Sequence, residues 1–354
     1  MAYKIMRLTK YYDALRTNTP FFKTSSKQKA RILFNILKFF IDKGKFVIRN
    51  RPVVAQIEPN STCNLKCEMC IREKIGVPIG TMNFEDFKKI LEKLDCLFKI
   101  HLSGQGEPFL NKDFFKMVEY ANQRGILVNT NTNATLLDEE AIRKICDVDM
   151  GEIGISIESP EEKTYEKIRK GAKFEELMRN IKNLTKKIKE ENKKTIVSFA
   201  ITILKENVDD IPKFVKLAER VGIKKIVFQT MQNKEDYLSK YSAKTRKQGV
   251  FDLAGKIEEK MEEAIKIAKE KGIILIFDEG KSSTGCVWPW RSIYISWNGF
   301  VTACCKILDY RTPYLGNILK EDLWKVWNGD EYQKFRRLLK DRKAPLPCRG
   351  CSMV

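Results

Sequence analysis

Three cysteines stand within eight residues of one another, in the segment Cys63-Asn-Leu-Lys-Cys67-Glu-Met-Cys70. Thiolates are metal ligands, and three of them on one short loop can converge on a single metal centre. Three ligands leave one iron of a cubane [4Fe–4S] cluster open to a substrate or cofactor. The alternative is a structural zinc site, which needs four ligands and often uses CxxC pairs. No fourth ligand lies nearby in the sequence, so the spacing favours the cluster.

A second group of cysteines lies near the end of the chain: Cys286, Cys304, Cys305, Cys348 and Cys351. The spacing is C-x12-G-x4-C from Cys286 through Gly299 to Cys304, followed by a terminal CxxC. A pair-plus-pair arrangement of this kind fits a structural zinc ion and a second [4Fe–4S] cluster equally well. Cys96 and Cys146 fall in helical patterns, where a small buried core residue is expected.

Polar side chains follow three of the expected strands. Ser103-Gly104-Gln105-Gly106-Glu107-Pro108 comes after the strand at 99–104, Thr132 and Asn133 follow 126–131, and Ser156 and Glu158 end 152–159. The carboxyl ends of parallel strands share one edge of a barrel, and active sites gather there. These groups are therefore expected beside the first cysteine loop.

Strands and helices alternate from residue 53 onward, which predicts a parallel sheet in an open or closed α/β barrel. We expect strands at 53–59, 99–104, 126–131, 152–159, 195–203 and 225–230, and helices at 84–94, 113–125, 138–146, 161–191, 208–222 and 251–271. The pattern changes after 272, where a strand at 273–278, a hairpin turned at Asn298-Gly299 and two short helices indicate a small separate unit. The expected organisation is a basic, largely helical arm at 1–51, a barrel at 52–272 and a C-terminal subdomain at 273–354.

These motifs resemble the radical S-adenosylmethionine (SAM) superfamily, in which CxxxCxxC follows the first strand of a partial barrel. The resemblance implies an α/β fold with a partial (β/α)6 TIM-type barrel. It gives Cys63, Cys67 and Cys70 to a SAM-binding [4Fe–4S] cluster. It further implies that a 5′-deoxyadenosyl radical, formed by reductive cleavage of SAM, abstracts hydrogen from a C–H bond. The implied SAM contacts are Met69, Ser103, Gly104, Gln105, Gly106, Glu107, Asn133, Ser156 and Glu158, with Gln105 standing where the family's GGEP motif has glycine.

Residues 273–354 resemble the shortened SPASM module called twitch, a small α+β iron–sulfur subdomain that carries one auxiliary cluster. The NGxVxxC hairpin, GNI, LWKVWNGDEYQKFRRLL and PCxxC carry this resemblance. It implies an auxiliary [4Fe–4S] cluster ligated by Cys286, Cys304, Cys348 and Cys351, with Cys305 as the rival of Cys304. A fully ligated cluster cannot bind substrate through iron, so its expected role is to accept an electron from a substrate radical.

The first function we expect is oxidative C–H chemistry, by dehydrogenation or C–C or C–X bond formation, on a small polyol, sugar or lipid-linked substrate. The alternative is maturation of a ribosomally made peptide. A further alternative is a non-catalytic metal- and nucleic-acid-binding protein. A flavodoxin or ferredoxin-type reductant is expected as the partner of such an enzyme, and no nucleic-acid partner is expected.

Composition excludes several other classes. The single histidine, His101, rules out HExxH zinc sites and leaves a His-based hydrolase only one possible base. No apolar run approaches the roughly 20 residues that span a bilayer, and the first residues lack the apolar region of a secretory signal. Ten cysteines without an export signal favour a reducing compartment, so we expect a cytoplasmic protein.

The formal net charge of +20 is concentrated at the N-terminus, because residues 1–51 hold 13 basic and only two acidic side chains. Apolar residues recur at helical spacing between residues 32 and 41, with basic residues around them. A helix packed on the barrel with solvated lysines is one interpretation of this pattern. The others are peripheral contact of residues 1–51 with an anionic membrane surface and, with less support, nucleic-acid binding.

Overall fold

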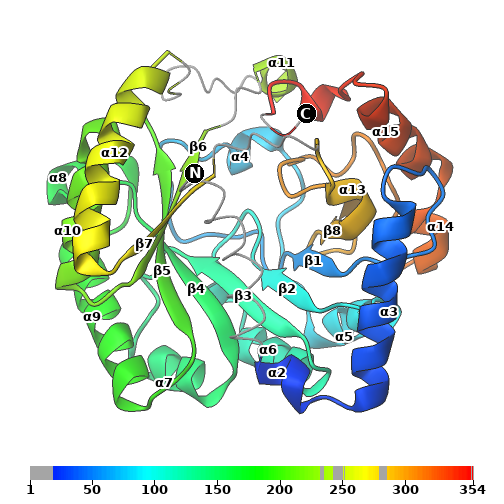
Figure 1. Ribbon diagram of the computed structural model, residues 1–354, viewed down its shortest axis with the longest axis horizontal. Coiled ribbons are helices and arrows are strands. Elements are labelled where there is room, and N and C mark those ends of the chain that lie inside the picture. The colour runs from blue at the N-terminus through cyan, green and yellow to red at the C-terminus, as the bar shows by residue number, and fades with distance from the viewer. Residues whose placement is uncertain are drawn as a thin grey trace.

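The computed structural model describes residues 19–231, 235–241, 250, 252–278, 285–351 and 353 of the 354-residue chain. Its centre is one nine-stranded sheet in the order β7-β6-β5-β4-β3-β2-β1-β8-β9, curved into an open barrel with helices on its outer side (Figure 1). Every neighbouring pair is parallel except β8–β9. The strands are β1 (Val54–Ile57), β2 (Lys99–Leu102), β3 (Leu127–Thr132), β4 (Met150–Ser156), β5 (Ile196–Ile203), β6 (Lys225–Thr230), β7 (Ile274–Asp278), β8 (Ser292–Ile295) and β9 (Val301–Thr302). The expected α/β class with a partial parallel barrel is confirmed.

Local chemistry accounts for the ends of several helices. Asn83 and Asp138 cap two helices by accepting hydrogen bonds from the Asp86 and Ala141 amides, and Gly272 ends another in the left-handed region at φ 62°. The helices are α2 (Thr19–Lys23), α3 (Ser26–Asp42), α4 (Arg72–Ile75), α5 (Phe84–Lys93), α6 (Phe114–Gln123), α7 (Glu139–Asp147), α8 (Glu162–Ile168), α9 (Phe174–Glu190), α10 (Ile211–Arg220), α11 (Glu235–Leu238), α12 (Ala254–Lys271), α13 (Trp288–Arg291), α14 (Leu323–Trp327) and α15 (Asp330–Lys340).

The single helix expected over 161–191 is two helices in the structure. α8 ends at Ile168 and α9 begins at Phe174, with Gly171 between them at φ +99°. Only glycine adopts that backbone conformation without strain. A Cβ on Gly171 would lie 3.4 Å from Leu65 and 3.7 Å from the Asn64 carbonyl oxygen, so the break brings this turn against the first cysteine loop.

Two strands lie where the sequence analysis did not place them. β7, assigned above to the C-terminal unit at 273–354, pairs in parallel with β6 and extends the barrel sheet. β8, the first strand of the expected hairpin, also pairs in parallel with β1, with Val54 opposite Ser292 and Ile57 opposite Ile295. Both pairings join segments far apart in the chain, which local patterns do not reveal. The C-terminal subdomain is therefore continuous with the barrel through the β1–β8 ladder.

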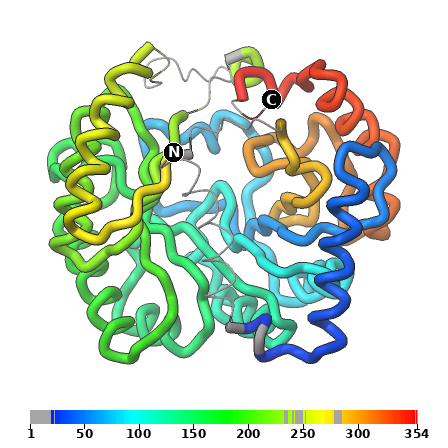
Figure 2. Tube along the Cα trace, in the orientation of Figure 1, coloured from blue at the N-terminus to red at the C-terminus, as the bar shows by residue number. Residues whose placement is uncertain are grey.

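Helix α3 belongs to the same packed body. Figure 2 shows α3, in blue, running next to the C-terminal segment, in orange and red. The Asn35 amide donates to the Arg51 carbonyl at 3.0 Å, and just past the helix the Trp290 indole donates to the Lys45 carbonyl at 2.7 Å. One hydrophobic core runs from the barrel strands to Trp327 and Tyr332 of the C-terminal unit. Within the described part of the chain, no helix has the length and apolar character needed to cross a bilayer.

Candidate active site and metal centres

The first cysteine set, Cys63, Cys67 and Cys70, lies on the loop that leaves the carboxyl end of β1. Cys63 and Cys67 are half-buried and Cys70 is exposed. Burial raises the pKa of Cys63 above its usual range and that of Cys67 to about 11. Charge on Cys70 also raises the pKa of Cys63, and charge on Cys63 and Cys70 raises that of Cys67, so the three thiols influence one another's ionisation. The protein therefore needs nearby positive charge or N–H donors to hold these sulfurs as thiolates.

Arg169 supplies one of those donors. Its Nη1 lies 3.9 Å from the Cys67 sulfur, and its charge acts against the burial that raises the pKa of Cys67. Its Nε and Nη2 donate to the two carboxylate oxygens of Glu158, the Nη2 bond being 2.9 Å long. Both residues are buried. The sequence analysis missed Arg169. The signal that could have identified it is its position two residues before Gly171, the glycine that separates α8 from α9.

Asn133 makes the corresponding contact with Cys63. Its Nδ2 lies 3.9 Å from the Cys63 sulfur and 2.9 Å from Asn64 Oδ1. Its Oδ1 accepts from the Thr135 amide at 3.0 Å and the Thr135 hydroxyl at 2.7 Å, which fixes the amide with Nδ2 toward the sulfur. The side chain expected after the third strand thus faces the cysteine loop.

The main chain of the cysteine loop is held from two sides. The Lys66 and Glu68 amides donate to the Lys170 and Ile168 carbonyls at 3.0 and 2.8 Å, on the turn between α8 and α9. On the other side, the Glu107 amide donates to the Thr62 carbonyl at 2.8 Å. Gly106 makes this approach possible, because a Cβ there would lie 2.2 Å from the Thr62 carbonyl oxygen.

The Glu107 carboxylate joins the ends of β2 and β3. It accepts from the Thr132 hydroxyl at 2.7 Å, the Asn133 amide at 2.8 Å and the Phe109 amide at 3.3 Å. Burial raises its pKa, while these donors act in the opposite direction. Its observed contacts position the loops, and in particular they place Asn133 beside Cys63.

Gln105 connects the barrel to the C-terminal subdomain. Its Nε2 donates to the Leu308 carbonyl at 2.9 Å, and its main-chain amide donates to Glu58 Oε1 at 2.8 Å. Its buried Oε1 has no donor among the described residues. Gln105 thus brings a buried, unsatisfied acceptor to the edge of the sheet that carries the cysteines.

Glu58 directly follows β1 and is buried against Tyr294, which hydrogen-bonds to it, and burial raises the pKa of both groups. Gly104 packs on Glu58, since a Cβ on Gly104 would lie 2.3 Å from Glu58 Cγ. The sequence analysis did not single out Glu58 or Tyr294. Together they occupy the β1–β8 seam, between the first cysteine loop and the C-terminal subdomain.

The remaining expected SAM contacts lie at the same edge. Ser103 is buried directly after β2, and its carbonyl accepts from Gln56 Nε2 at 3.1 Å. Ser156 is the last residue of β4, and Met69 is half-buried immediately before Cys70. The topology therefore places all the expected SAM-contact residues on the loops or strand ends around the first cysteine set.

The donor chemistry fits an iron–sulfur cluster with SAM. Arg169 and Asn133 each point an N–H group at a cysteine sulfur, an arrangement that stabilises thiolates and is common around iron–sulfur clusters. Three thiols on one loop match a cluster with one open iron. The unsatisfied Gln105 Oε1 offers a buried acceptor that suits an ammonium or hydroxyl donor, both of which SAM carries.

The second cysteine set is Cys286, Cys304, Cys348 and Cys351. Cys286 interacts electrostatically with Cys304 and Cys351, and burial raises its pKa to about 12. Cys348 is buried at the end of a 3-10 turn (Leu346–Cys348), and the Cys351 amide donates to its carbonyl at 3.1 Å. The buried Tyr332 hydroxyl interacts with Cys304 and Cys286 and has no partner among the described residues. Such an unsatisfied hydroxyl donor suits an anionic group with sulfide acceptors, such as an iron–sulfur cluster bound by these cysteines.

Cys304 and Cys305 have different surroundings. The Lys306 amide donates to the Cys304 sulfur at 3.4 Å, and Cys304 interacts with Cys286 and Tyr332. Cys305 instead interacts with Tyr294, the partner of Glu58. All ten cysteines lie within the described residues, and none forms a disulfide. Cys96 and Cys146 are buried, as expected for core residues.

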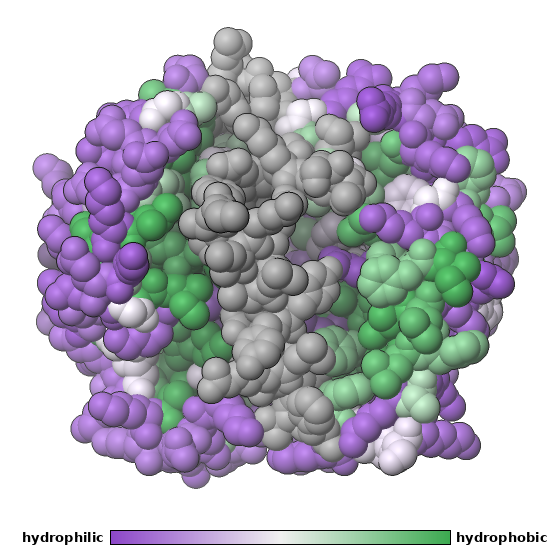
Figure 3. Space-filling model, in the orientation of Figure 1, coloured by the Kyte–Doolittle hydropathy of each residue, from purple (hydrophilic) through white to green (hydrophobic). Residues whose placement is uncertain are grey.

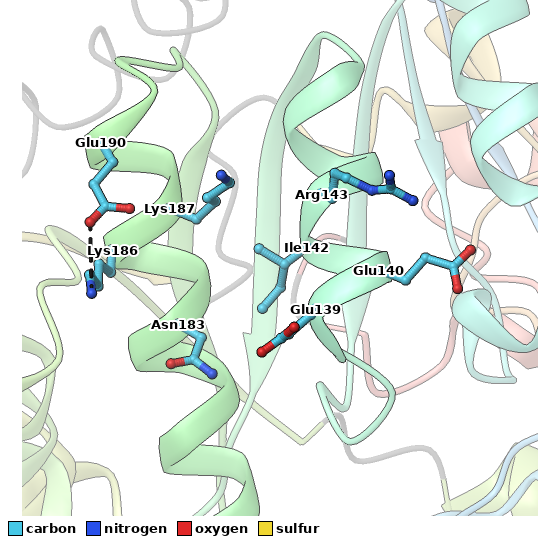
Figure 4. Close-up of a pocket in the computed structure, with 8 residues that line it drawn as sticks. All are labelled: Glu139, Glu140, Ile142, Arg143, Asn183, Lys186, Lys187 and Glu190. Carbon is cyan, nitrogen blue, oxygen red and sulfur yellow. Dashed lines mark ion pairs between the residues drawn. The ribbon is translucent and has the colours of Figure 1, made fainter.

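A groove on the outer helical layer is separate from this edge. Side chains of α7 and α9 line it, including Glu139, Arg143 and Lys187, and Lys186 pairs with Glu190 along α9 at 3.8 Å (Figure 4). Its lining is a set of charged helix surfaces and contains no cysteine. It offers no chemistry related to the two cysteine sets.

Comparison with known families agrees with both parts of the site. Residues 57–218 match the model described as the radical SAM superfamily, and residues 286–352 match the SPASM model, described as an iron–sulfur cluster-binding domain. The first match runs from the last residue of β1 to most of α10 and contains the first cysteine set. The second contains all members of the second cysteine set.

Curated relatives include the tungsten-containing aldehyde ferredoxin oxidoreductase cofactor-modifying protein of Pyrococcus furiosus, 25% identical over 84% of this chain and 86% of that protein. The PqqA peptide cyclase of Granulibacter bethesdensis is 22% identical over 85% of this chain and 79% of that protein. The Fe-coproporphyrin III synthase of Methanosarcina barkeri is 31% identical, but the match spans 55% of this chain and only 46% of that protein.

Among solved structures, Streptococcus suis SuiB bound to precursor peptide SuiA is similar in fold. The TM-score is 0.68 at 17% identity, with 91% of this chain and 74% of that chain covered. The anSMEcpe structure with bound AdoMet gives a TM-score of 0.64 at 17% identity, with 85% of each chain covered. At these identities the likeness concerns the fold.

Proposed function

This chain belongs to the radical SAM superfamily and carries a C-terminal SPASM iron–sulfur domain, and we propose that it oxidises a C–H bond in a peptide substrate. It is an enzyme that uses SAM, a [4Fe–4S] cluster and an auxiliary SPASM cluster. When bound, these groups supply a 5′-deoxyadenosyl radical and an acceptor for the substrate's second electron. The residues proposed to hold them are the two cysteine sets defined above.

The observation that carries oxidative chemistry is the β1–β8 ladder. The first cysteine set follows β1, and the second includes Cys304, which follows the β8–β9 hairpin. Tyr294 lies on β8 and hydrogen-bonds to Glu58, the residue that follows β1. A cluster acceptor held beside the radical-generating site supports removal of two electrons from a substrate, and a buried carboxyl with a raised pKa can accept the accompanying proton.

The remaining side chains have binding and positioning roles in this proposal. Arg169 and Asn133 hold the Cys67 and Cys63 sulfurs as thiolates. Glu107, Thr132 and Gly106 fix the loop that carries them, and Gln105 contributes the buried acceptor for SAM. Cys304 is favoured over Cys305 as a cluster ligand, because Cys304 interacts electrostatically with Cys286 and with the buried Tyr332 hydroxyl.

A peptide is favoured over the small polyol, sugar or lipid-linked substrate expected first. The PqqA peptide cyclase aligns over most of both chains, which supports a peptide. The cofactor-modifying relative also aligns over most of both chains and supports a second candidate, the modification of a cofactor. For either substrate, we expect a flavodoxin or ferredoxin-type electron donor in the cytoplasm.

The test is to reconstitute the full chain with iron and sulfide, reduce it, and supply SAM with a short peptide encoded beside its gene. The proposal expects 5′-deoxyadenosine together with loss of two hydrogen atoms from the peptide, measured by mass spectrometry. Cys67→Ala is expected to abolish both products. An unchanged peptide, with 5′-deoxyadenosine formation stimulated instead by a small metabolite fraction, contradicts the peptide assignment.

A further inference from the structure

Helix α3 carries an exposed apolar stripe, defined here as Leu33, Phe34, Leu37, Phe40 and Ile41. These five side chains are 55% to 69% exposed, and Val47, just beyond the helix, is 58% exposed. At 100° per residue they fall on one continuous side of the helix. Side chains this large are usually buried, so a row of them in one place indicates an interaction surface.

The stripe is not the face that holds α3 to the protein. Ile32, Asn35, Phe39 and Asp42 are buried on the other side. The interpretation of α3 as a helix packed on the body is therefore correct for one face and leaves the other unexplained. In Figure 3, hydrophobic side chains gather where Figure 1 places α3, with hydrophilic side chains around them.

Basic side chains border the stripe. By helical geometry Lys27, Arg31 and Lys38 lie along one flank and Lys29 along the other. Lys38 Nζ sits 4.7 Å from the centre of the Phe34 ring, so this charge directly adjoins the stripe. Past the end of the helix, Lys43, Lys45 and Arg49 are exposed.

No acidic side chain of residues 19–51 opposes the α3 lysines of this border, while Arg31 pairs with Asp95 from outside the segment at 3.2 Å. Asp42 is the single acidic residue between positions 19 and 51, and it is buried. It accepts from Arg49 Nη2 at 2.9 Å and Lys45 Nζ at 2.8 Å, and these partners lower its pKa well below the usual range. The border of the stripe thus presents one sign of charge.

We propose that this stripe binds the surface of an anionic lipid bilayer, with α3 lying in the plane of the interface. Leucine, isoleucine and phenylalanine side chains enter the acyl region, while the flanking lysines and arginines meet anionic headgroups. Because α3 is already folded and anchored by its buried face, binding does not require ordering the helix. The contact is peripheral and independent of the two cysteine sets.

Charge favours an anionic bilayer over the other possible partners of the stripe. A second copy of the chain packed stripe to stripe brings two basic borders together, which is unfavourable. Nucleic acid matches the charge but leaves five hydrocarbon side chains without an apolar partner. An anionic bilayer satisfies both the apolar stripe and its basic border.

The experiment is co-sedimentation of the full reconstituted chain with phosphatidylcholine vesicles and with vesicles that also contain phosphatidylglycerol. We expect binding to the anionic vesicles, weakened by added salt, and little binding to neutral ones. Leu37→Ser/Phe40→Ser should lower the partition coefficient about a hundredfold, through loss of buried apolar area. Lys27→Glu/Lys38→Glu should lower it about tenfold or more on anionic vesicles alone.

The control variant is Ile265→Ser, which changes an exposed apolar residue on α12 instead of α3. It should bind like the unchanged protein, and all variants should retain iron content and SAM cleavage, which shows that they fold. Equal vesicle binding by Leu37→Ser/Phe40→Ser overturns the proposal. A concentration-dependent dimer that this variant dissociates, with no vesicle binding by the unchanged protein, also overturns it and assigns the stripe to a second copy.

Discussion

Arg169 donates to the Cys67 sulfur and to both carboxylate oxygens of Glu158, so one guanidinium joins the first cysteine loop to the segment just after β4. Of these three residues, only Glu158 was among the expected SAM contacts. In the structure, Glu158 instead orients the Arg169 guanidinium, and Arg169 interacts with the Cys67 thiol.

Replacing Arg169 by Gln removes this charge and leaves Glu158 buried without a cation. The expected result is a further rise in the pKa of Cys67, loss of iron from the first site and at least a tenfold fall in SAM cleavage. Breaking a buried ion pair on one side costs about 3–5 kcal/mol of stability. Iron content, 5′-deoxyadenosine formation and thermal unfolding measure these effects. Arg179→Gln is the matched control, because Arg179 is exposed and forms a long ion pair with Glu176, at 3.8 Å. Full iron loading of Arg169→Gln would contradict the proposed role of Arg169.

Cys304→Ala and Cys305→Ala form a pair that distinguishes neighbouring thiols. The unchanged protein should hold about eight irons, four in each cluster. Cys304→Ala is expected to lose the auxiliary cluster and retain about four, whereas Cys305→Ala retains about eight. Iron analysis and the electron paramagnetic resonance signals of the two clusters provide the measurement. The reverse result places the ligand at Cys305.

Gly106→Ala tests the close approach of two main-chain segments, at Gly106 and at residues 60–62. A Cβ at this position meets the Thr62 and Asn60 carbonyl oxygens at 2.2 and 2.5 Å, so the cysteine loop must move. We expect at least a tenfold loss of SAM cleavage with the auxiliary cluster retained. Gly255→Ala, in α12 with open space around it, should leave cleavage unchanged and stabilise the fold by up to about 1 kcal/mol. Normal cleavage in Gly106→Ala means that the loop is not held through this contact.

The pH dependence of stability should carry the signature of His101. Burial and the neighbouring Lys99 ammonium lower its pKa to about 4, while Glu152 acts in the opposite direction. Between that value and the usual 6.5, the unfolded chain binds more protons, so stability falls as the pH decreases. The loss from this half-buried residue is at most about 2 kcal/mol between pH 7.5 and 5. His101→Gln should show a correspondingly smaller decrease in urea unfolding of the cluster-free protein; parallel pH curves contradict the assignment.

Much of the fold follows from local patterns. Alternating apolar segments predicted β1 to β6 to within a few residues, because buried parallel strands read as short runs of Val, Ile and Phe. The first cysteine loop and the Gly104–Glu107 turn were readable because both follow strands whose ends share an edge. The same logic predicted Asn133 beside the loop, and the structure places its amide at Cys63.

The rest depended on contacts between distant segments. Arg169 reaches Cys67 only because Gly171 interrupts a pattern that otherwise predicts one helix. The parallel pairing of β8 with β1 and of β7 with β6 is specified by packing, and a strand's own sequence does not name its partner. Cys304 and Cys305 are adjacent, so the spacing of the cysteines cannot tell which of the two interacts with Cys286.

The β1–β8 ladder has a consequence for turnover. Val54 to Ile57 are paired residue by residue with Ser292 to Ile295, and the Glu58 amide adds a bond to the Ile295 carbonyl at 2.8 Å. A hinge between the barrel and the C-terminal unit would have to break this ladder. The strand ends from which the Cys63 loop and the Cys304 hairpin leave therefore keep a constant separation, and movement during turnover is confined to the loops beyond them.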